Sequence, residues 1–451
     1  MTIAGRRPFD LPISAKRLHD PVGTTLDHSC DVLVIGGGPA GSAISALLAQ
    51  KGWAVTVLEK DHHPRFHIGE SLLPLSIPFF ERLGVLPQIE AIGLRKYAAE
   101  FHSMYHGKSS RFHFREALDS SFPYAFEVKR AEFDHVLIRN AAGKGAEVRE
   151  GWRVTGVELK DDRIQGVTAV DGQGGEQRWT PRFVVDASGR DTFLASYFGI
   201  KSRNPKHNSA ALYGHFRGAQ RQCGQDEGNI CIYWFDHGWF WMIPLKDDLM
   251  SVGAVCWPYY LKIRTVEVEQ FFRDTLAQCP GVAARLADAE LVSEVTATGN
   301  YAYQSSRMRG ANYLLIGDAF AFIDPVFSSG VHLALNSAFE GADTVDGALR
   351  DPATAAARMA RFDRTVRRGL ETFSWFIYRI TTPAIRDMVL HPRNPWRIKD
   401  AVISLLAGDL FRGTPVGPRL LVFKAIYYLK TLFGPQTSYA AYKRRRDNIA
   451  V

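Results

Sequence analysis

The chain has 451 residues, more than one compact core usually serves, so we expect two closely packed domains or one large unit with a cap over a substrate. With 46% hydrophobic and 23% charged residues, the composition is that of a folded protein and excludes a disordered or repetitive chain. The formal net charge of +8 is spread along the chain, so no nucleic-acid partner is expected.

Cysteine spacing and apolar segments bear on cofactors and location. The 5 cysteines form no C-x-x-C pair and no histidine cluster has helix-face spacing, so neither a metal site nor a disulfide framework is expected. Residues 1–29 read as an N-terminal extension without the features of a signal peptide, so a cytoplasmic protein is expected. The apolar segments at 373–380 and 420–433 contain basic residues and fall short of the ~18 apolar residues of a membrane span. No membrane contact is expected.

The first predicted element is a β-branched strand at 31–35, followed by a glycine-rich turn, a small-residue helix at 42–51 and a second strand at 54–58. This order predicts a βαβ dinucleotide-binding unit, with an acid at the end of the second strand to bind a ribose. A glycine turn with a helix N-terminus behind it suits a pyrophosphate. The candidate cofactor-binding residues of this unit are Gly36, Gly38, Pro39, Ala40, Gly41, Glu59 and Lys60.

The next predicted strands, at 152–158, 164–170 and 177–185, form an antiparallel meander attached to a parallel sheet. A further strand at 313–316 ends in Gly317-Asp318. The stretch from about 195 to 300 is aromatic, with a helix predicted at 266–290, and the pattern is helical from residue 352.

These elements predict an α/β fold with a Rossmann-like βαβ domain and meander, an inserted substrate-side β-sheet domain and a helical C-terminal cap. The expected ranges are 1–29 for the extension, 30–195 and 296–350 for the dinucleotide-binding domain, 196–295 for the substrate side, and 351–451 for the helical region.

The glycine motif, Arg130-x-x-Phe-Asp, residues 186–189 and Gly317-Asp318 together resemble the flavin monooxygenase superfamily built on the aromatic-hydroxylase fold. The resemblance implies that the first motif holds the ADP part of FAD, that Arg130 contacts the sugar or phosphate region, and that Asp318 binds the ribityl chain. Taken singly, Asp318 could cap a helix and Arg130 could be an ordinary ion-pair partner.

Two segments resemble the signatures of flavin-dependent halogenases: Trp239-x-Trp241-x-Ile243-Pro244, and the loop from Phe322 to Gly330. Residues 69–74 are similar to a segment of halogenases that act on phenolic, pyrrolic or carrier-tethered substrates. In the family the aromatic signature is a barrier that keeps the substrate from the flavin. On its own, a run of bulky rings in a strand is also typical of core packing.

Backbone amides of the loop at 325–331, at the start of a predicted helix, suit a halide because they offer oriented dipoles without an oxidisable base. We therefore place the halide near Ser329 and Gly330, with Pro325, Gly330 and Val331 beside the cofactor. The resemblance implies that chloride or bromide reacts with a flavin C4a-hydroperoxide, formed from reduced FAD and oxygen, to give hypohalous acid. It also implies that a lysine, Lys96 here, directs this oxidant to the substrate.

Tryptophan halogenases have a glutamate shortly before the Ser-x-Gly turn, where this chain has Phe327. We infer an electron-rich ring, phenolic or pyrrolic, free or tethered to a carrier protein, rather than tryptophan. No second nucleotide motif is present, so a separate flavin reductase is expected to supply reduced FAD. The alternatives are an FAD-dependent aromatic monooxygenase, whether hydroxylase or epoxidase, an isoprenoid reductase of the same scaffold, and a flavoprotein without catalytic activity.

Overall fold

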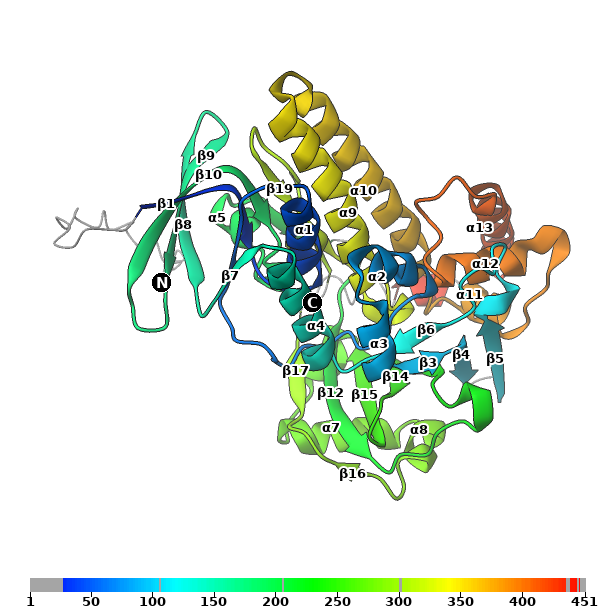
Figure 1. The fold of residues 1–451 in the computed structure, drawn as a ribbon. Helices are drawn as coiled ribbons and strands as arrows, with labels where there is room; N and C mark the ends of the chain where they lie inside the picture. The colour runs from blue at the N-terminus through cyan, green and yellow to red at the C-terminus, as the bar shows by residue number, and fades with distance from the viewer. Residues whose placement is uncertain are drawn as a thin grey trace, which may run out of the picture.

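The computed structural model describes residues 27–104, 107–204, 207–299, 302–434, 439–443 and 446 (Figure 1). Most of the predicted N-terminal extension, residues 1–26, lies outside these described residues. In the described residues the fold consists of two large sheets, two small ones (β11-β18-β20 and β3-β6) and a set of C-terminal helices. The helix pair α9 (Gly330–Arg350) and α10 (Ala355–Ile377) runs beside the first large sheet (Figure 1).

The first sheet contains the predicted βαβ unit. Strand β1 (Asp27–Ile35) runs parallel to β2 (Val55–Glu59) and to β10 (Glu176–Asp186), and helix α1 (Pro39–Gln50) connects β1 to β2. In the described residues the strand order is β7-β2-β1-β10-β9-β8, with β19 also paired to β10. The remaining strands are β7 (Glu147–Glu150), β8 (Arg153–Lys160), β9 (Arg163–Val170) and β19 (Tyr313–Leu315).

Strand β10 joins the parallel sheet to the predicted meander. Its residues 176–179 pair antiparallel with β9, residues 178–186 pair parallel with β1, and residues 184–186 pair parallel with β19. The carboxyl ends of β1, β2, β10 and β19 therefore meet at one edge, where ligands of open α/β sheets bind.

The second sheet has the order β16-β12-β15-β14-β13-β4-β5 in the described residues, with β17 paired to β12. Two of its strands, β4 and β5, come from residues 98–113, so this sheet uses more of the chain than the 196–295 range expected for the substrate side. Its strands are β4 (Ala98–Ser103), β5 (Lys108–His113), β12 (Ala210–Arg217), β13 (Ile230–Phe235), β14 (Gly238–Pro244), β15 (Leu249–Cys256), β16 (Glu290–Leu291) and β17 (Thr296–Thr298).

The two faces of this second sheet belong to different cores, because side chains alternate along each strand. Trp239 and Trp241 of β14 face the C-terminal helices, whereas Phe240 and Met242 face α7 (Val268–Ala277) and α8 (Pro280–Arg285). The single helix predicted at 266–290 is therefore two helices, and α8 begins at Pro280, which cannot donate a hydrogen bond within a continuing helix.

Short elements join the larger parts. Strands β3 and β6 form an antiparallel pair, and helix α4 follows β6 directly. Their bounds, with those of the other short elements, are α2 (Ile77–Leu83), α3 (Leu86–Ile92), β3 (Leu94–Lys96), β6 (Ala125–Glu127), α4 (Arg130–Gly143), α5 (Phe193–Tyr197), β11 (Lys201–Arg203), α6 (Pro258–Lys262), β18 (Tyr303–Ser305) and β20 (Ala321–Phe322).

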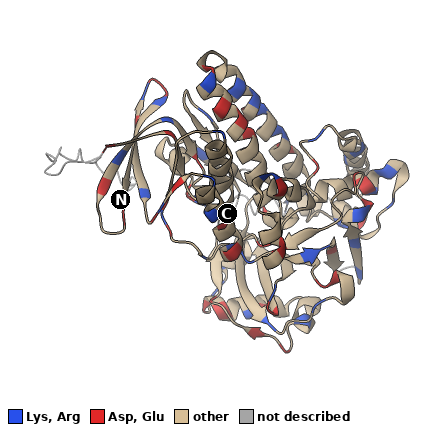
Figure 2. Ribbon diagram, in the orientation of Figure 1, with Lys and Arg blue, Asp and Glu red and all other residues tan. Residues whose placement is uncertain are grey.

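The C-terminal region is helical, as expected. Helices α11 (Pro383–Leu390), α12 (Ile398–Leu406) and α13 (Val416–Phe433) share one core with the Trp239 face of the second sheet. The α/β fold with its βαβ unit, meander, second sheet and helical cap is confirmed. Among the described residues, no helix combines the length and hydropathy needed to cross a membrane. Lys and Arg, like Asp and Glu, are scattered over the ribbon rather than gathered in one segment (Figure 2).

Candidate functional site

A cavity of about 750 Å³ lies between the carboxyl edge of the first sheet and the inner face of the second. That volume is within the range of ordinary ligand and cofactor sites. Its lining contains most of the residues predicted from sequence, namely Gly36, Gly38, Pro39, Ala40, Glu59, Lys60, Arg130, Trp239, Trp241, Ile243, Asp318, Pro325, Ser329, Gly330 and Val331. Gly41, Pro244 and Lys96 do not line it.

The glycine turn is shaped for close approach of a ligand to the backbone. Gly36 has φ +99°, and a Cβ there would lie 2.6 Å from the Ala187 carbonyl oxygen. A Cβ on Gly41 would lie 1.9 Å from the Gly36 carbonyl oxygen, so Gly41 lets α1 pack against the turn. By contrast, a Cβ on Gly38 would meet only Arg65, at 3.9 Å, and would project into open space beside the cavity.

Glu59 closes this turn from the end of β2. Its carboxylate accepts hydrogen bonds from the backbone amides of Gly37, at 2.6 Å, and Asp61, at 2.9 Å. Lys60 forms an ion pair with Asp191. Both Glu59 and Lys60 line the cavity at the position expected for the adenosine ribose.

Arg130 is held rigidly at the start of α4. Its guanidinium donates two hydrogen bonds to Asp134, at 2.8 and 3.0 Å, and a third to the carbonyl of Ile68 at 2.7 Å. Burial alone raises the pKa of Asp134, but the charge and hydrogen bonds of Arg130 outweigh it and lower that pKa. A second cation, Arg65, lies 3.3 Å from Asp134 and 3.8 Å from Glu59. Sequence reasoning missed Arg65.

Asp318 lies just after β19 and is a half-buried carboxyl group in the cavity wall. Desolvation raises its pKa to about 6, although Arg130 and Arg190 act in the opposite direction. The nearby Asp186 accepts hydrogen bonds from the backbone amides of Ser188 and Leu194, which holds the turn after β10. Of these two acids, only Asp318 lines the cavity.

The predicted halide loop folds around Asp324. This carboxylate is 1% exposed and accepts hydrogen bonds from the Val326 amide, His207 and Ser209. Ser328 has φ +55°, and α9 begins at Gly330. Ser329 precedes the helix but its side chain makes no capping hydrogen bond. The first amides of this helix have no acceptor within it, and Ser329, Gly330 and Val331 line the cavity.

The aromatic wall comes from one face of β14. Trp239, Trp241 and Ile243 alternate along the strand and line the cavity, with the two indole rings 6.0 Å apart. Trp241 donates a hydrogen bond to Ser251 at 3.2 Å. Opposite Trp241 lies Gly253, where an added Cβ would come within 2.2 Å of the indole. The residue at 253 must therefore be glycine for this indole to lie flat on the sheet.

Lys96 lies behind the cavity wall rather than in it. It is 1% exposed, and its Nζ donates a hydrogen bond to Ser71 Oγ at 2.8 Å. Ser71 itself lines the cavity and donates to Glu127 Oε1 at 3.1 Å. Nζ also lies 3.8 Å from Glu127 Oε1 and 5.6 Å from the ring centre of Phe114. One side chain, Ser71, thus separates the lysine from the cavity.

The Lys96–Glu127 pair is fully buried, and burial disfavours the charged form of both groups. The pKa of Lys96 is lowered by burial, with Glu127 opposing the change. Burial likewise raises the pKa of Glu127 to about 8, although Lys96 and Ser71 act to lower it. Glu127 Oε2 has no hydrogen-bond partner among the described residues. Burial thus favours the neutral forms of both groups.

Sequence reasoning missed Glu127, because nothing in its neighbourhood marks it. Glu127 reaches Lys96 through the pairing of β6 with β3 and an isolated bridge to Ser71. It also missed the buried pair of Glu70, which lines the cavity, and His215, 3.0 Å away. Ser71 and Glu70 lie within the recognised segment at 69–74, which was the only signal for them.

The residues present fit FAD. The open space at Gly38, the amides of the glycine turn and the start of α9 suit phosphates, and the buried Arg130 and the half-buried Asp318 are polar groups on the cavity wall. The opposite end of the cavity is aromatic, which suits a flat ring system.

Comparison with known proteins gives the following matches. Residues 29–356 match the family model described as FAD binding domain. A tryptophan 2-halogenase from Chondromyces crocatus is 34% identical over 75% of this chain and 65% of its own length, so the match spans just under two thirds of that relative. The 1H-pyrrole-2-carbonyl-[peptidyl-carrier protein] chlorinase of Pseudomonas fluorescens is 30% identical over 86% of this chain and 91% of its own length.

The fold also matches solved structures. The myxobacterial chondrochloren halogenase, described as a new variant of FAD-dependent halogenases, superposes with a TM-score of 0.76. It is 32% identical and covers 86% of this chain, with 92% of that structure matched.

Proposed function

Because this chain belongs to the flavin-dependent halogenases and carries their FAD-binding domain, we propose that it passes an oxidised halogen from the FAD cavity to an electron-rich aromatic ring through Lys96. The observation that carries the proposal is the position of Ser71, which lines the cavity and hydrogen-bonds Lys96. The lysine is therefore one residue away from the cavity.

When bound, reduced FAD supplies with oxygen the oxidising equivalents that convert a halide into an electrophilic halogen. The chain's own residues bind and orient the cofactor: Gly36, Gly38 and the start of α1 hold the pyrophosphate, Glu59 the adenosine ribose, and Arg130 and Asp318 the region between pyrophosphate and ring. The amides of Ser329 and Gly330 bind the halide at the start of α9.

Lys96 suits the transfer step because its amine is buried, and burial lowers its pKa and favours the neutral, nucleophilic form. Burial also raises the pKa of Glu127 to about 8, so near neutral pH this group is protonated and does not hold the lysine in its charged form. The proton that the amine nitrogen loses leaves as water with the hydroxide of hypohalous acid. Ser71 orients the amine toward the cavity by accepting one hydrogen bond and donating another to Glu127.

Trp239, Trp241 and Ile243 form the barrier between cofactor and substrate. They present an apolar surface without a nucleophilic amine or thiol along it, so an oxidant formed in the cavity reaches the substrate by way of Lys96. Such a barrier disfavours direct oxygen transfer and favours halogenation over hydroxylation.

The proposed substrate is a phenol or pyrrole, either free or on a carrier protein. A relative of similar length is named for a pyrrole on a peptidyl carrier protein. The relative named for tryptophan also acts on an electron-rich heteroaromatic ring, so indole belongs in the test. We also propose that a separate flavin reductase delivers reduced FAD.

The experiment supplies the purified protein with FAD, a flavin reductase, NADH, oxygen and chloride or bromide. The substrates are phenols, pyrroles, tryptophan and pyrrolyl groups on a carrier protein. Mass spectrometry should detect a halogenated ring that requires FAD and halide. Oxygen insertion that does not depend on halide would instead establish the monooxygenase alternative.

A further inference from the structure

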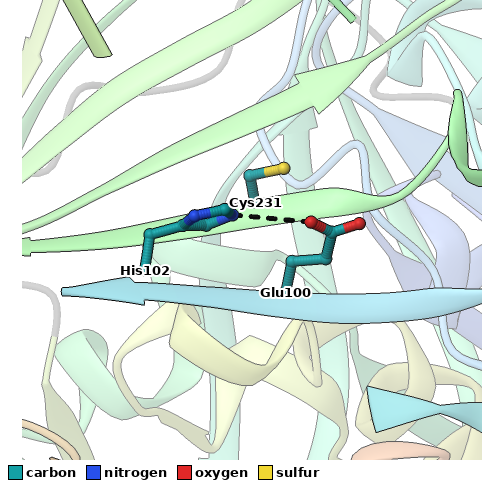
Figure 3. A group of neighbouring side chains, drawn as sticks. All are labelled: Glu100, His102 and Cys231. Carbon is teal, nitrogen blue, oxygen red and sulfur yellow. Dashed lines mark ion pairs between the residues drawn. The ribbon is translucent and has the colours of Figure 1, made fainter. Parts of the chain in front are cut away.

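The face of the second sheet that packs against α7 and α8 carries a cluster of three metal-ligand side chains that do not line the cofactor cavity: Glu100, His102 and Cys231 (Figure 3). Glu100 and Cys231 are direct neighbours on the parallel strands β4 and β13, and His102 lies two residues along β4 on the same face. One ligand atom from each residue lies within 4.8 Å of the other two. From this geometry we infer that the cluster is a binding site for one zinc ion, with a single position open to another ligand.

The chemistry of the three groups favours zinc. A thiolate, an imidazole and a carboxylate are the ligand types that tetrahedral Zn²⁺ takes, whereas Mg²⁺ and Ca²⁺ prefer oxygen alone. With a thiolate and a carboxylate, the bound set is electrically neutral. The side chain of His102 is 20% exposed, which leaves room for a water molecule as fourth ligand.

The distances fit a shared ion better than a hydrogen bond. His102 Nε2 lies 3.5 Å from Glu100 Oε2, and this nitrogen is buried without a hydrogen-bond partner among the described residues. Two ligands about 2.05 Å from a tetrahedral zinc are separated by about 3.3 Å. The observed separation is therefore close to the edge of a zinc tetrahedron.

The ligands are held in place by groups that would form the outer shell of the site. The His102 ring stacks on Tyr233, with centroids 4.4 Å apart and planes 12° from parallel. Glu100 accepts hydrogen bonds from Asn229 at 3.1 Å and Gln222 at 3.1 Å, and pairs with Arg111 at 2.8 Å. Fixing the orientation of ligands in this way strengthens metal binding.

The charges beside the cluster are balanced. Arg111 forms ion pairs with Glu100 at 2.8 Å and with Asp226.

Residues 100, 102 and 231 form no short ligand motif, so no metal site was expected from the sequence. The strand pairing of β4 with β13 brings them together.

The test is metal binding by the full-length protein after dialysis against a chelator. Titration with Co²⁺ should give a thiolate-to-cobalt charge-transfer band that saturates at one ion per chain and disappears when Zn²⁺ is added. Cys231→Ala should abolish the band. Cys256→Ala should keep it, because Cys256 is equally buried in the same core but outside the cluster.

His102→Gln is the second variant, in case Cys231→Ala does not fold, and should weaken binding at least tenfold. Circular dichroism and FAD binding report that each variant is folded. A saturating stoichiometry below one ion per chain, or an unchanged cobalt spectrum in either cluster variant, would overturn the assignment. Uptake lost only on replacing the exposed Cys223 would also overturn it, since that result indicates an adventitious ion.

Discussion

Replacing Lys96 with Met tests the proposed route of the halogen, because Met has similar length and no amine. Groups that act by proton transfer contribute about 10²- to 10⁴-fold to a rate, so Lys96→Met should lower the halogenation rate at least about 100-fold. FAD should bind normally, since Lys96 does not line the cavity. Oxidation of reduced FAD and release of peroxide or hypohalite should continue.

The stability of Lys96→Met follows from the partner it leaves behind. Removing one member of a buried ion pair costs about 3–5 kcal/mol when the other stays charged. Here Glu127 is protonated at neutral pH, because its pKa is about 8 rather than 4.5. We therefore expect a loss below about 2 kcal/mol at pH 6, as for a buried substitution without an unpaired charge.

The pH dependence has a definite sign. Between pH 4.5 and about 8, folded Glu127 holds a proton that the unfolded chain has released, so the group's contribution to stability is full below pH 4.5 and is lost as the pH rises toward 8. The slope is about 1.4 kcal/mol per pH unit. Lys96 lowers the pKa of Glu127, so in Lys96→Met that pKa is higher and the loss of stability continues to higher pH.

The assay is urea denaturation at pH 5 and pH 8. Lys96→Met should lose up to about 4 kcal/mol more over this interval than the double variant Lys96→Met/Glu127→Gln, which has no titrating group there. Equal pH dependence in both proteins would refute the reasoning about Glu127. Halogenation of a single ring position by Lys96→Met, at an undiminished rate, would refute the role of the lysine.

Three further predictions concern the cofactor cavity. Gly38→Val should abolish FAD binding while the protein stays folded, because the added side chain projects into the cavity. Gly41→Ala should instead lower the melting temperature, because its Cβ would lie 1.9 Å from a backbone oxygen. FAD titration and calorimetry distinguish the two effects, and equal effects of the two variants would contradict the assignment. Gly253→Ala should displace Trp241 and lower the free energy of unfolding by about 1–3 kcal/mol through overpacking. It should also raise the share of hydroxylated over halogenated product, and an unchanged ratio of the two products argues against the barrier. Arg130→Met should cost up to about 3–5 kcal/mol, because it removes the main partner of the buried Asp134 and leaves only Arg65 beside it. Wild-type stability in urea would show that this pair is not important.

Much of the fold could be predicted because local patterns determine it. The strand, glycine turn and helix around Gly36 combine hydrophobic periodicity with a turn that only glycine adopts, and both signals are local. The meander at 152–185 was equally readable from alternation and turns. The helix predicted at 266–290 was wrong in length, because Pro280 has no backbone N–H for a continuing helix and begins a second helix instead.

The site was predictable only where a motif extends over neighbouring residues. Trp239 and Trp241 belong to such a motif, whereas Glu127 and Arg65 reach the site through strand pairing and loop conformation, which a single sequence does not encode locally. For the same reason the sequence does not indicate that Cys231 lies beside Glu100, because only the long-range pairing of β13 with β4 makes them neighbours.

The walls of the FAD cavity come from segments as far apart as Gly36 and Ala334. During synthesis the glycine turn at Gly36 emerges early, but β14 and the start of α9, which complete the cavity, follow hundreds of residues later. FAD therefore loads after most of the chain has been made, and its occupancy reports on the folding of the whole molecule. Loss of the coenzyme should accompany unfolding of either sheet, and excess coenzyme should protect both.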